Sequence, residues 1–423
     1  MAAAVQVTAE QVRRYRLAVH HLDHPCPPEQ LLSAAGVCGF QNSPPGAWET
    51  AAFVRMPQCT RSGLQAALEQ EKTLLQAWSY RGVPVIFPTE ESAVFLSALA
   101  AQPGEEPWIY TRGITLALDF LGMKWEDALA LVEQAVRLLD GCAVQSKEEL
   151  DRVLAAEAVA LLPAEQRQRW NAPSMYGRPD RQTVGGAVVS FALRPCAFLG
   201  QVVFGERRGT HPTFTSYRRW TGHTIPADPQ AEQKLVRKFL HGYGPAAQVD
   251  LAAWLGCTPR QAKRLWQAVK EELVPVQKEG KTAYLLENDL PALTGARPAE
   301  EPLVLLGAHD PYLDARDRTF LLEDTTLQRQ VWRTVANPNV ILFQGQIVGI
   351  WKTKTVRNRM DVTWTLFKPL PSGWEKQLLR KVEAYAAFRG MEPGTCRQEQ
   401  AKKSPANFCT DSRGFFMFKR RHA

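Results

Sequence analysis

A short uncharged loop, residues 39–46, carries the side chains of this chain whose types and spacing could do chemistry. It reads Gly-Phe-Gln-Asn-Ser-Pro-Pro-Gly. The prolines restrict the backbone, so the amide of Gln41 would be held in a fixed orientation. Together with Asn42 and Ser43, that amide could hold a water molecule against a substrate. The same residues could instead start a helix, with Asn42 or Ser43 as the cap, and spacing alone favours this structural interpretation.

The elements that would position this loop follow a repeated order. Helical periodicity predicts helices at residues 9–22, 28–35, 47–55 and 62–78, followed by an extended segment through 83–87. The segment 90–140 is predicted to be helical as well. The order returns with helices at 147–161 and 185–195, and with strands at 197–205 and 212–217. The turn between these strands is basic and holds Arg207, Arg208, Thr210 and His211.

A third copy of this order is the clearest. Helices are predicted at 230–241, 248–255 and 259–273, and a hairpin turns at 278–281. Helix, turn, helix and hairpin in this order are typical of a winged helix. The last of these helices carries Lys263 and Arg264.

The character of the chain changes after a linker at 295–301. Four strand-like segments and one helix follow, at 304–306, 340–343, 347–351, 362–366 and 374–389. We therefore predict an α+β protein, mainly helical, with three tandem winged-helix units and a β-rich C-terminal domain. The expected boundaries are 1–143, 144–229, 230–300 and 301–423.

Charge and composition restrict the class of partner. The formal net charge is +8 and the pI is near 9.1. Residues 201–240 hold seven Lys or Arg against three Asp or Glu, and a second cluster consists of Lys352, Lys354, Arg357 and Arg359 without an acid. A third lies at 419–421. Any one of these clusters could simply be a charged face exposed to solvent. Three clusters along one chain instead favour a surface that contacts phosphates.

Other features exclude several classes of function. The eight cysteines form no Cys-x-x-Cys motif and no cluster with histidines, so no metal site and no cofactor are expected. No run of 18 apolar residues predicts a membrane span, and the first residues form a basic amphipathic helix rather than a signal peptide. We expect a cytoplasmic protein, associated with the nucleoid if the source is bacterial.

Six segments in order resemble the winged-helix DNA glycosylase family of AlkZ and YcaQ. They are residues 39–43, 76–82, 208–214, 243–246 and 310–318, and Asn337-Pro338 followed by a strand with Gly345, Gly349 and Trp351. The resemblance implies a C-shaped molecule whose concave basic channel takes duplex DNA. It also implies a monomer that excises bulky N-alkylated purines without a cofactor, and some members unhook interstrand crosslinks.

The family motif is Gln-aliphatic-Gln or Gln-aliphatic-Asp, and it aligns with Gln41, Asn42 and Ser43. Only Gln41 is kept. The Thr-Leu-His segment of many members is replaced here by residues 83–85, Val-Pro-Val, so that histidine is missing. N7-alkylation makes a guanine cationic and a good leaving group, so an amide that orients water could suffice although it is a poor base. We expect Gln41 to position the water, Ser43 to assist weakly, and Glu49 to be a fallback for charge stabilisation.

The resemblance also suggests the residues that contact DNA. Phosphate or groove contacts are predicted for Arg81 and for the basic residues in the wing, the third-copy helix and the C-terminal cluster: Arg207, Arg208, Thr210, His211, Lys263, Arg264, Lys352, Lys354, Arg357 and Arg359. For Arg81 an internal ion pair is an equal alternative, and for His211 a capping role. Residues 310–318 are expected to form a structural ion-pair network. Ser43 also favours a second hypothesis, a regulator or lesion sensor without catalysis, and an RNA-binding protein is a third.

Overall fold

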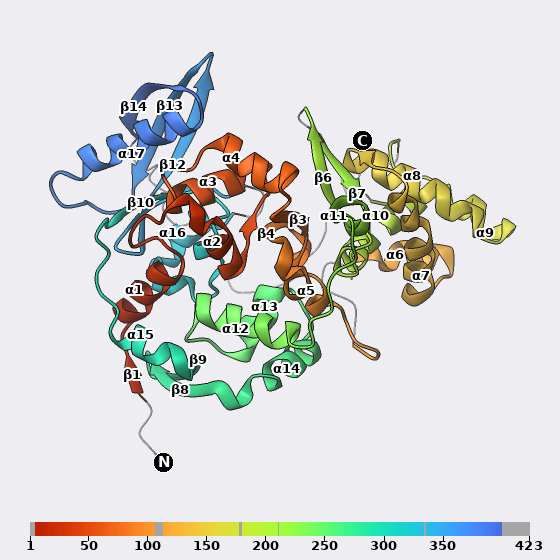
Figure 1. The fold of residues 1–423 in the computed structure, drawn as a ribbon, viewed down its shortest axis with the longest axis horizontal. Helices are drawn as coiled ribbons and strands as arrows, with labels where there is room; N and C mark the ends of the chain where they lie inside the picture. The colour runs from red at the N-terminus through yellow and green to blue at the C-terminus, as the bar shows by residue number, and fades with distance from the viewer. Residues whose placement is uncertain (1–4, 106–112, 177–179, 210, 334–335, 400–423) are drawn as a thin grey trace, which may run out of the picture.

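The computed structural model describes residues 5–105, 113–176, 180–209, 211–333 and 336–399. The described chain combines helices with three three-stranded sheets, and a five-stranded sheet lies in its C-terminal part (Figure 1). The predicted α+β class is therefore confirmed. The division into units at 143, 229 and 300 remains a prediction. Among the described residues, no helix combines the length and the apolar character that crossing a membrane requires.

The loop at 39–46 belongs to the first sheet, whose order is β2-β4-β3. The strands are β2 (Phe40–Gln41), β3 (Leu74–Trp78) and β4 (Pro84–Pro88). The helices beside them are α2 (Leu31–Cys38), α3 (Ala47–Arg55) and the short α4 (Arg61–Gln65), which continues as a π-helical turn, η2 (Ala66–Gln70). A four-residue helix, α5 (Ser92–Phe95), follows β4.

The helix predicted over 62–78 is wrong in its last third. Residues 74–78 form β3, pair with β4 in antiparallel register, and are buried along their whole length. Sheet pairing and burial on both faces decide this segment, because β-structure depends on its neighbours more than on intrinsic preference.

The second sheet has the order β5-β7-β6. Its strands are β5 (Val144–Gln145), β6 (Val203–Arg208) and β7 (His211–Thr215). The helices of this region are α6 (Thr115–Leu121), α7 (Trp125–Val136), α8 (Lys147–Ala160), α9 (Ala164–Trp170), α10 (Val184–Phe198) and α11 (Tyr217–Thr221). The strand predicted from residue 197 begins only at Val203, since α10 continues through Pro195 to Phe198.

The third sheet combines distant segments, in the order β1-β8-β9. The predicted hairpin is formed by β8 (Leu273–Lys278) and β9 (Lys281–Leu286), and β1 (Val5–Val7) joins it in parallel. The helices are α1 (Ala9–Val19), α12 (Ala231–Tyr243), α13 (Gln248–Leu255), α14 (Pro259–Gln267) and α15 (Leu290–Thr294). The helix predicted over 259–273 ends six residues early, at Gln267.

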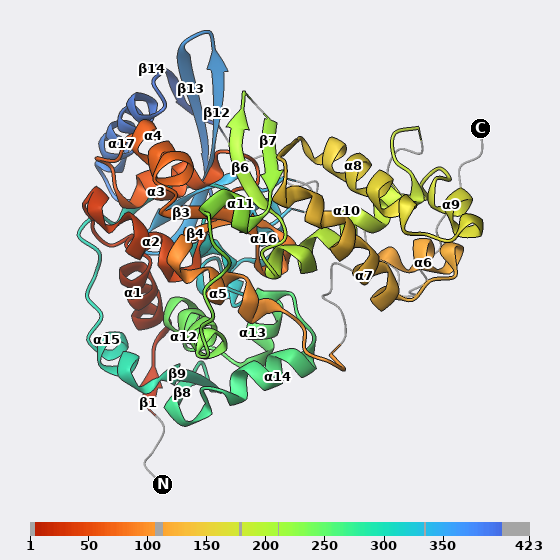
Figure 2. The ribbon, with the colours of Figure 1, turned by 45° about the vertical axis from the view of Figure 1, so that its right-hand side comes forward.

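The five-stranded sheet runs β10-β11-β12-β13-β14. Its strands are β10 (Leu303–Leu306), β11 (Asn339–Phe343), β12 (Gln346–Val356), β13 (Arg359–Leu366) and β14 (Glu392–Gln398). The helices here are α16 (Thr325–Val331) and α17 (Trp374–Phe388). The strands extend past the predicted ones, so the basic cluster at 352–359 lies on the β12–β13 hairpin. That hairpin and the β6–β7 hairpin extend toward the same side of the molecule (Figures 1 and 2).

Buried ion pairs join the N-terminal helices to the segment 310–318, as the sequence predicted. Arg55 donates two hydrogen bonds to Asp310, at 2.7 and 2.9 Å, and neither side chain is more than 1% exposed. Arg16 binds Asp317 through both terminal nitrogens, and Lys278 approaches the same carboxylate at 2.8 Å. Burial alone would raise the pKa of Asp317, but these two cations hold that pKa below its usual range.

Trp78 connects the first sheet to the second. Its ring stacks on Phe214 with ring centroids 5.3 Å apart, and it meets Phe204 at 5.0 Å. Phe204 and Phe214 lie on β6 and β7, so the base of that hairpin packs on β3. Through β4, the same sheet carries the loop that contains Gln41.

Candidate functional site

Gln41 ends β2 and lies opposite Val85 of β4. The residue is only 7% exposed. Its Nε2 donates a long hydrogen bond, 3.5 Å, to the backbone oxygen of Ser43. Its Oε1 accepts no hydrogen bond from the described residues, and it is not among the polar atoms shut away from solvent without a partner. The amide oxygen is therefore available to accept a hydrogen bond from a water molecule.

Asn42 faces inward and holds the loop together. Its Nδ2 donates to Oε1 of Gln76 at 3.1 Å, and its Oδ1 accepts from the backbone N–H of Gly46 at 2.7 Å. Its own backbone N–H donates to Pro84 at 2.8 Å. Asn42 is 6% exposed, and both polar atoms of its side chain are hydrogen-bonded inside the protein. Asn42 therefore has a structural role, and the predicted water-holding group is reduced to Gln41 and Ser43.

The capping interpretation of the loop is wrong. Helix α3 begins at Ala47, and Gly46 occupies the N-cap position with φ 90° and without a side-chain cap. Glycine adopts this left-handed conformation without the steric cost that other residues pay. Neither Asn42 nor Ser43 caps the helix directly, since Asn42 reaches only the N–H of the glycine before it.

We predict that Gln76→Met loosens the loop, because it removes the acceptor that Asn42 uses and leaves a buried amide unpaired. The expected loss of stability is about 1–3 kcal/mol. Hydrogen exchange at the amide of Gly46 should become faster, which mass spectrometry of the peptide covering the loop would measure. Gln65→Met is the matched control, since Gln65 is exposed and bonds only to Glu69, and it should change neither quantity. Unchanged exchange in Gln76→Met would refute the role of this hydrogen bond.

The position of the missing family histidine faces Gln41. Val85 stands in the Val-Pro-Val segment that replaces Thr-Leu-His, and it pairs directly with Gln41 across the two strands. Val85 is fully buried and offers no group that could take a proton. Any water at Gln41 would therefore be oriented without help from this neighbour.

Glu49, the predicted fallback, is already paired. Its Oε2 lies 3.0 Å from Arg61 and 3.6 Å from Arg389, and its side chain is 13% exposed. Two arginines offset the charge that would otherwise stabilise a cationic sugar. The structure thus favours Gln41 over Glu49, although the role of either residue stays a prediction.

Helix α17 clamps the helix that follows the loop, which the sequence did not indicate. Thr50 and Tyr385 share a hydrogen bond of 2.9 Å between their hydroxyls, and Phe53 stacks on Phe388 at 4.6 Å. These partners are separated by more than 300 residues, so periodicity could not reveal the contact. The C-terminal part of the chain thereby supports the loop from behind α3.

The two basic hairpins present exposed cations. On β6 and β7, Arg207, Arg208 and His211 are exposed, and the backbone N–H of Arg207 is anchored to Glu69 at 3.2 Å. Thr210 lies outside the described residues. On the β12–β13 hairpin all four predicted cations are exposed, and none has a carboxylate partner among the described residues: Lys352, Lys354, Arg357 and Arg359. Both surfaces are free to meet a polyanion.

Two of the other predicted DNA contacts have internal partners instead. Arg81 donates to Asp314 at 2.7 Å and to the backbone oxygen of Trp254 at 3.1 Å. Arg264 binds Glu105, at 2.7 Å, and Glu232. Each guanidinium would have to give up a carboxylate to reach a phosphate, so neither is retained as a DNA contact. Lys263 is exposed and remains one.

A family model described as AlkZ-like, DNA glycosylase AlkZ-like, matches residues 34–388. Among solved structures, the Streptomyces sahachiroi DNA glycosylase AlkZ superposes with a TM-score of 0.72. It shares 21% identity with this chain, and the match covers 93% of this chain and 100% of that one. No curated protein matches the chain. The structural likeness shows that the fold described above is AlkZ-like.

Proposed function

This chain belongs to the AlkZ-like family of DNA glycosylases, and on that premise we propose that it hydrolyses the N-glycosidic bond of N-alkylated purines in duplex DNA. The proposed substrates are purines alkylated at N7 and similar positions, including those joined in interstrand crosslinks. The observation that carries the proposal is the free amide oxygen of Gln41 on a loop that Asn42 and β4 hold in place.

For hydrolysis of this glycosidic bond, the main task of the protein is to orient the attacking water molecule. An N7-alkylated purine leaves as a neutral base, and the developing charge on the sugar is cationic. Gln41 Oε1 would accept a hydrogen bond from the attacking water and so fix its position, which saves the entropy of bringing water and sugar together. The loop contains no lysine that could attack the sugar, so the proposed enzyme is monofunctional. The test is release of 7-methylguanine from duplex DNA by wild type and by Gln41→Ala.

A lesion sensor without catalysis is the second candidate. One observation favours it: Ser43 replaces the second motif carboxylate or amide. Tight binding of alkylated duplex without release of any base would support the sensor. Such a result would leave the DNA-binding part of the proposal intact.

We predict that the two hairpins hold the DNA backbone. Replacing Arg207 and Arg208 by glutamine, or Lys352 and Lys354 by glutamine, should weaken duplex binding. The logarithm of the binding constant falls as the logarithm of the salt concentration rises, and each lost phosphate contact makes this fall shallower by about 1. Each pair of substitutions should therefore reduce the magnitude of the slope by about 2. Fluorescence anisotropy across a salt series measures this slope. A single-stranded RNA competitor in the same assay tests the RNA alternative.

A matched control removes the same charge from cations that already have carboxylate partners. Arg152 pairs with Glu149, and Lys234 pairs with Asp228 at 2.7 Å. The double variant Arg152→Gln/Lys234→Gln should keep the wild-type slope. If the hairpin variants behave like this control, the hairpins do not contact phosphates.

A further inference from the structure

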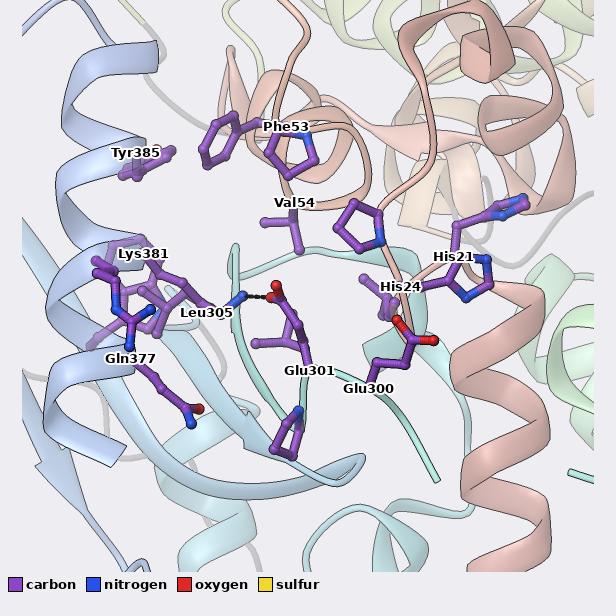
Figure 3. A pocket seen from close by; sticks show the side chains of 17 residues that line it. His21, His24, Phe53, Val54, Glu300, Glu301, Leu305, Gln377, Lys381 and Tyr385 are labelled. Atoms are coloured by element: carbon purple, nitrogen blue, oxygen red, sulfur yellow. Dashed lines mark hydrogen bonds and ion pairs between the residues drawn. The ribbon is translucent and has the colours of Figure 1, made fainter. Parts of the chain in front are cut away.

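Two recesses of similar size differ in the charge of their lining. The cavity of about 410 Å³ between α3 and α17 has two carboxylates and two lysine or arginine side chains, and the Glu301–Lys381 ion pair lies in its middle (Figure 3). A cleft of about 390 Å³ beside the second sheet is lined by Lys72, Arg208 and Arg219 against a single carboxylate. A concave surface with an excess of one charge concentrates its field, so this cleft favours an anion.

The cleft lies beside the β6–β7 hairpin, between the second sheet and α11. Gly205 and Thr213, on β6 and β7, line one side of it, and Arg219 and Trp220 of α11 line the other. Helix α11 packs beside β6 (Figure 2). Arg208 lines the cleft and also belongs to the hairpin surface that is proposed above to hold phosphates. The cleft therefore continues that surface toward α11.

Lys72 reaches the cleft from the segment between η2 and β3. Its Nζ donates to the backbone oxygen of Trp220 at 2.7 Å and lies 4.4 Å from the centroid of a Trp220 ring. An ammonium group has three N–H donors, so two remain for an anion. Glu69, three residues earlier, accepts the backbone N–H of Arg207 at 3.2 Å. The segment 69–72 thus fixes both the hairpin and the ammonium group, and binding an anion there would require little reordering.

The hydroxyl groups of the cleft are already used inside the protein. The Thr213 hydroxyl donates to the backbone oxygen of Glu206 at 2.6 Å, and the Thr215 hydroxyl lies 3.3 Å from two backbone oxygens. The side chains of Arg208 and Arg219 are exposed, and neither bonds to a residue of the described chain. The donors left for a ligand are therefore cationic, and phosphate oxygens are strong acceptors for guanidinium and ammonium groups.

We propose that this cleft binds the phosphate backbone of the duplex, so that a strand held at the hairpin runs on along the second sheet to α11. Lys72 would donate to one phosphate, and Arg219 to the same phosphate or to the next one along the strand. Each phosphate of the strand carries a charge, so the three cations need not meet at one atom. The inference rests on the proposed function only in taking duplex DNA as the partner, and it requires no base release.

The test is duplex binding by Arg219→Gln, measured by fluorescence anisotropy with undamaged DNA across a salt series. Loss of one phosphate contact should reduce the magnitude of the slope of log binding constant against log salt concentration by about 1. Adding Lys72→Gln should bring the reduction to about 2. Arg219→Lys keeps the charge and should therefore keep the wild-type slope. The Arg219 side chain is exposed and makes no internal bond, so urea denaturation should show unchanged stability.

Arg218→Gln is the matched control. Arg218 precedes Arg219 on α11 and is also exposed, but it does not line the cleft, so its loss should leave the slope unchanged. A wild-type slope in Arg219→Gln, or equal changes in the two variants, would overturn the proposal. A protein that binds DNA through the cleft and releases no base would contradict the proposed activity alone. A failed cleft contact would leave that activity standing.

Discussion

Gln41→Ala is expected to slow the release of 7-methylguanine from duplex DNA by about 100-fold or more in single-turnover assays. The amide oxygen of Gln41 is the available acceptor on the loop, and alanine leaves the water without a fixed partner. Gln41 makes one long hydrogen bond, so its loss should not unfold the loop. Duplex affinity should therefore remain within about twofold of wild type, because the charges that bind phosphates are unchanged.

The controls separate catalysis from folding. Ser43→Ala should slow release less than tenfold, since a hydroxyl at this position is at most a weak second partner for the water. Gln65→Ala, an exposed glutamine on α4, should not change the rate. Wild-type release by Gln41→Ala would remove this residue from the mechanism. Binding without release by the wild type would instead select the sensor.

Asp310→Ala is expected to cost about 3–5 kcal/mol of folding free energy. The guanidinium of Arg55 is 1% exposed and its partner carboxylate is fully buried, so the variant would leave a cation without compensation. Asp310 also accepts the backbone N–H of Tyr312 at 3.0 Å, and that donor would lose its partner too. Urea denaturation followed by tryptophan fluorescence measures the change.

Two comparisons show whether the buried charge is the cause. Asp228→Ala breaks the exposed pair with Lys234 and should cost less than about 1 kcal/mol. The double variant Arg55→Met/Asp310→Ala removes the stranded cation and should recover part of the loss. An Asp310→Ala protein as stable as Asp228→Ala would contradict the assigned role of this ion pair.

The sequence predicted most of the helices and turns whose limits are set by neighbouring residues. The helix at 248–255 has the predicted bounds, and the hairpin at 278–281 turns where expected, because capping residues and glycines mark both. The segment 74–78 was mistaken for helix, since nothing in its own residues shows that β2 and β3 lie on either side of β4. Pairing with β4, the next strand along the chain, decides the conformation of that segment.

In the candidate site, too, the local motif could be predicted from the sequence, whereas contacts between distant segments could not. Gln41 could be singled out from the motif, but the inward turn of Asn42 could not, because its partner Gln76 is 34 residues away. The family resemblance suggests DNA contacts for Arg81 and Arg264, with an internal ion pair as an equal alternative for Arg81, and the structure gives both guanidinium groups internal carboxylate partners. Their carboxylate partners come from segments far along the chain, Asp314 and Glu105, and composition cannot place them.

The Asn42–Gln76 hydrogen bond restricts the order in which this loop can change by mutation. An aliphatic residue at 42, as in the family motif, would strand the buried amide of Gln76, and an apolar residue at 76 would strand that of Asn42. Either single step is unfavourable, whereas the two together are close to neutral apart from the contact with Gly46. Restoring the family motif one position at a time would therefore pass through a weaker protein, and position 76 has to be redesigned together with the loop.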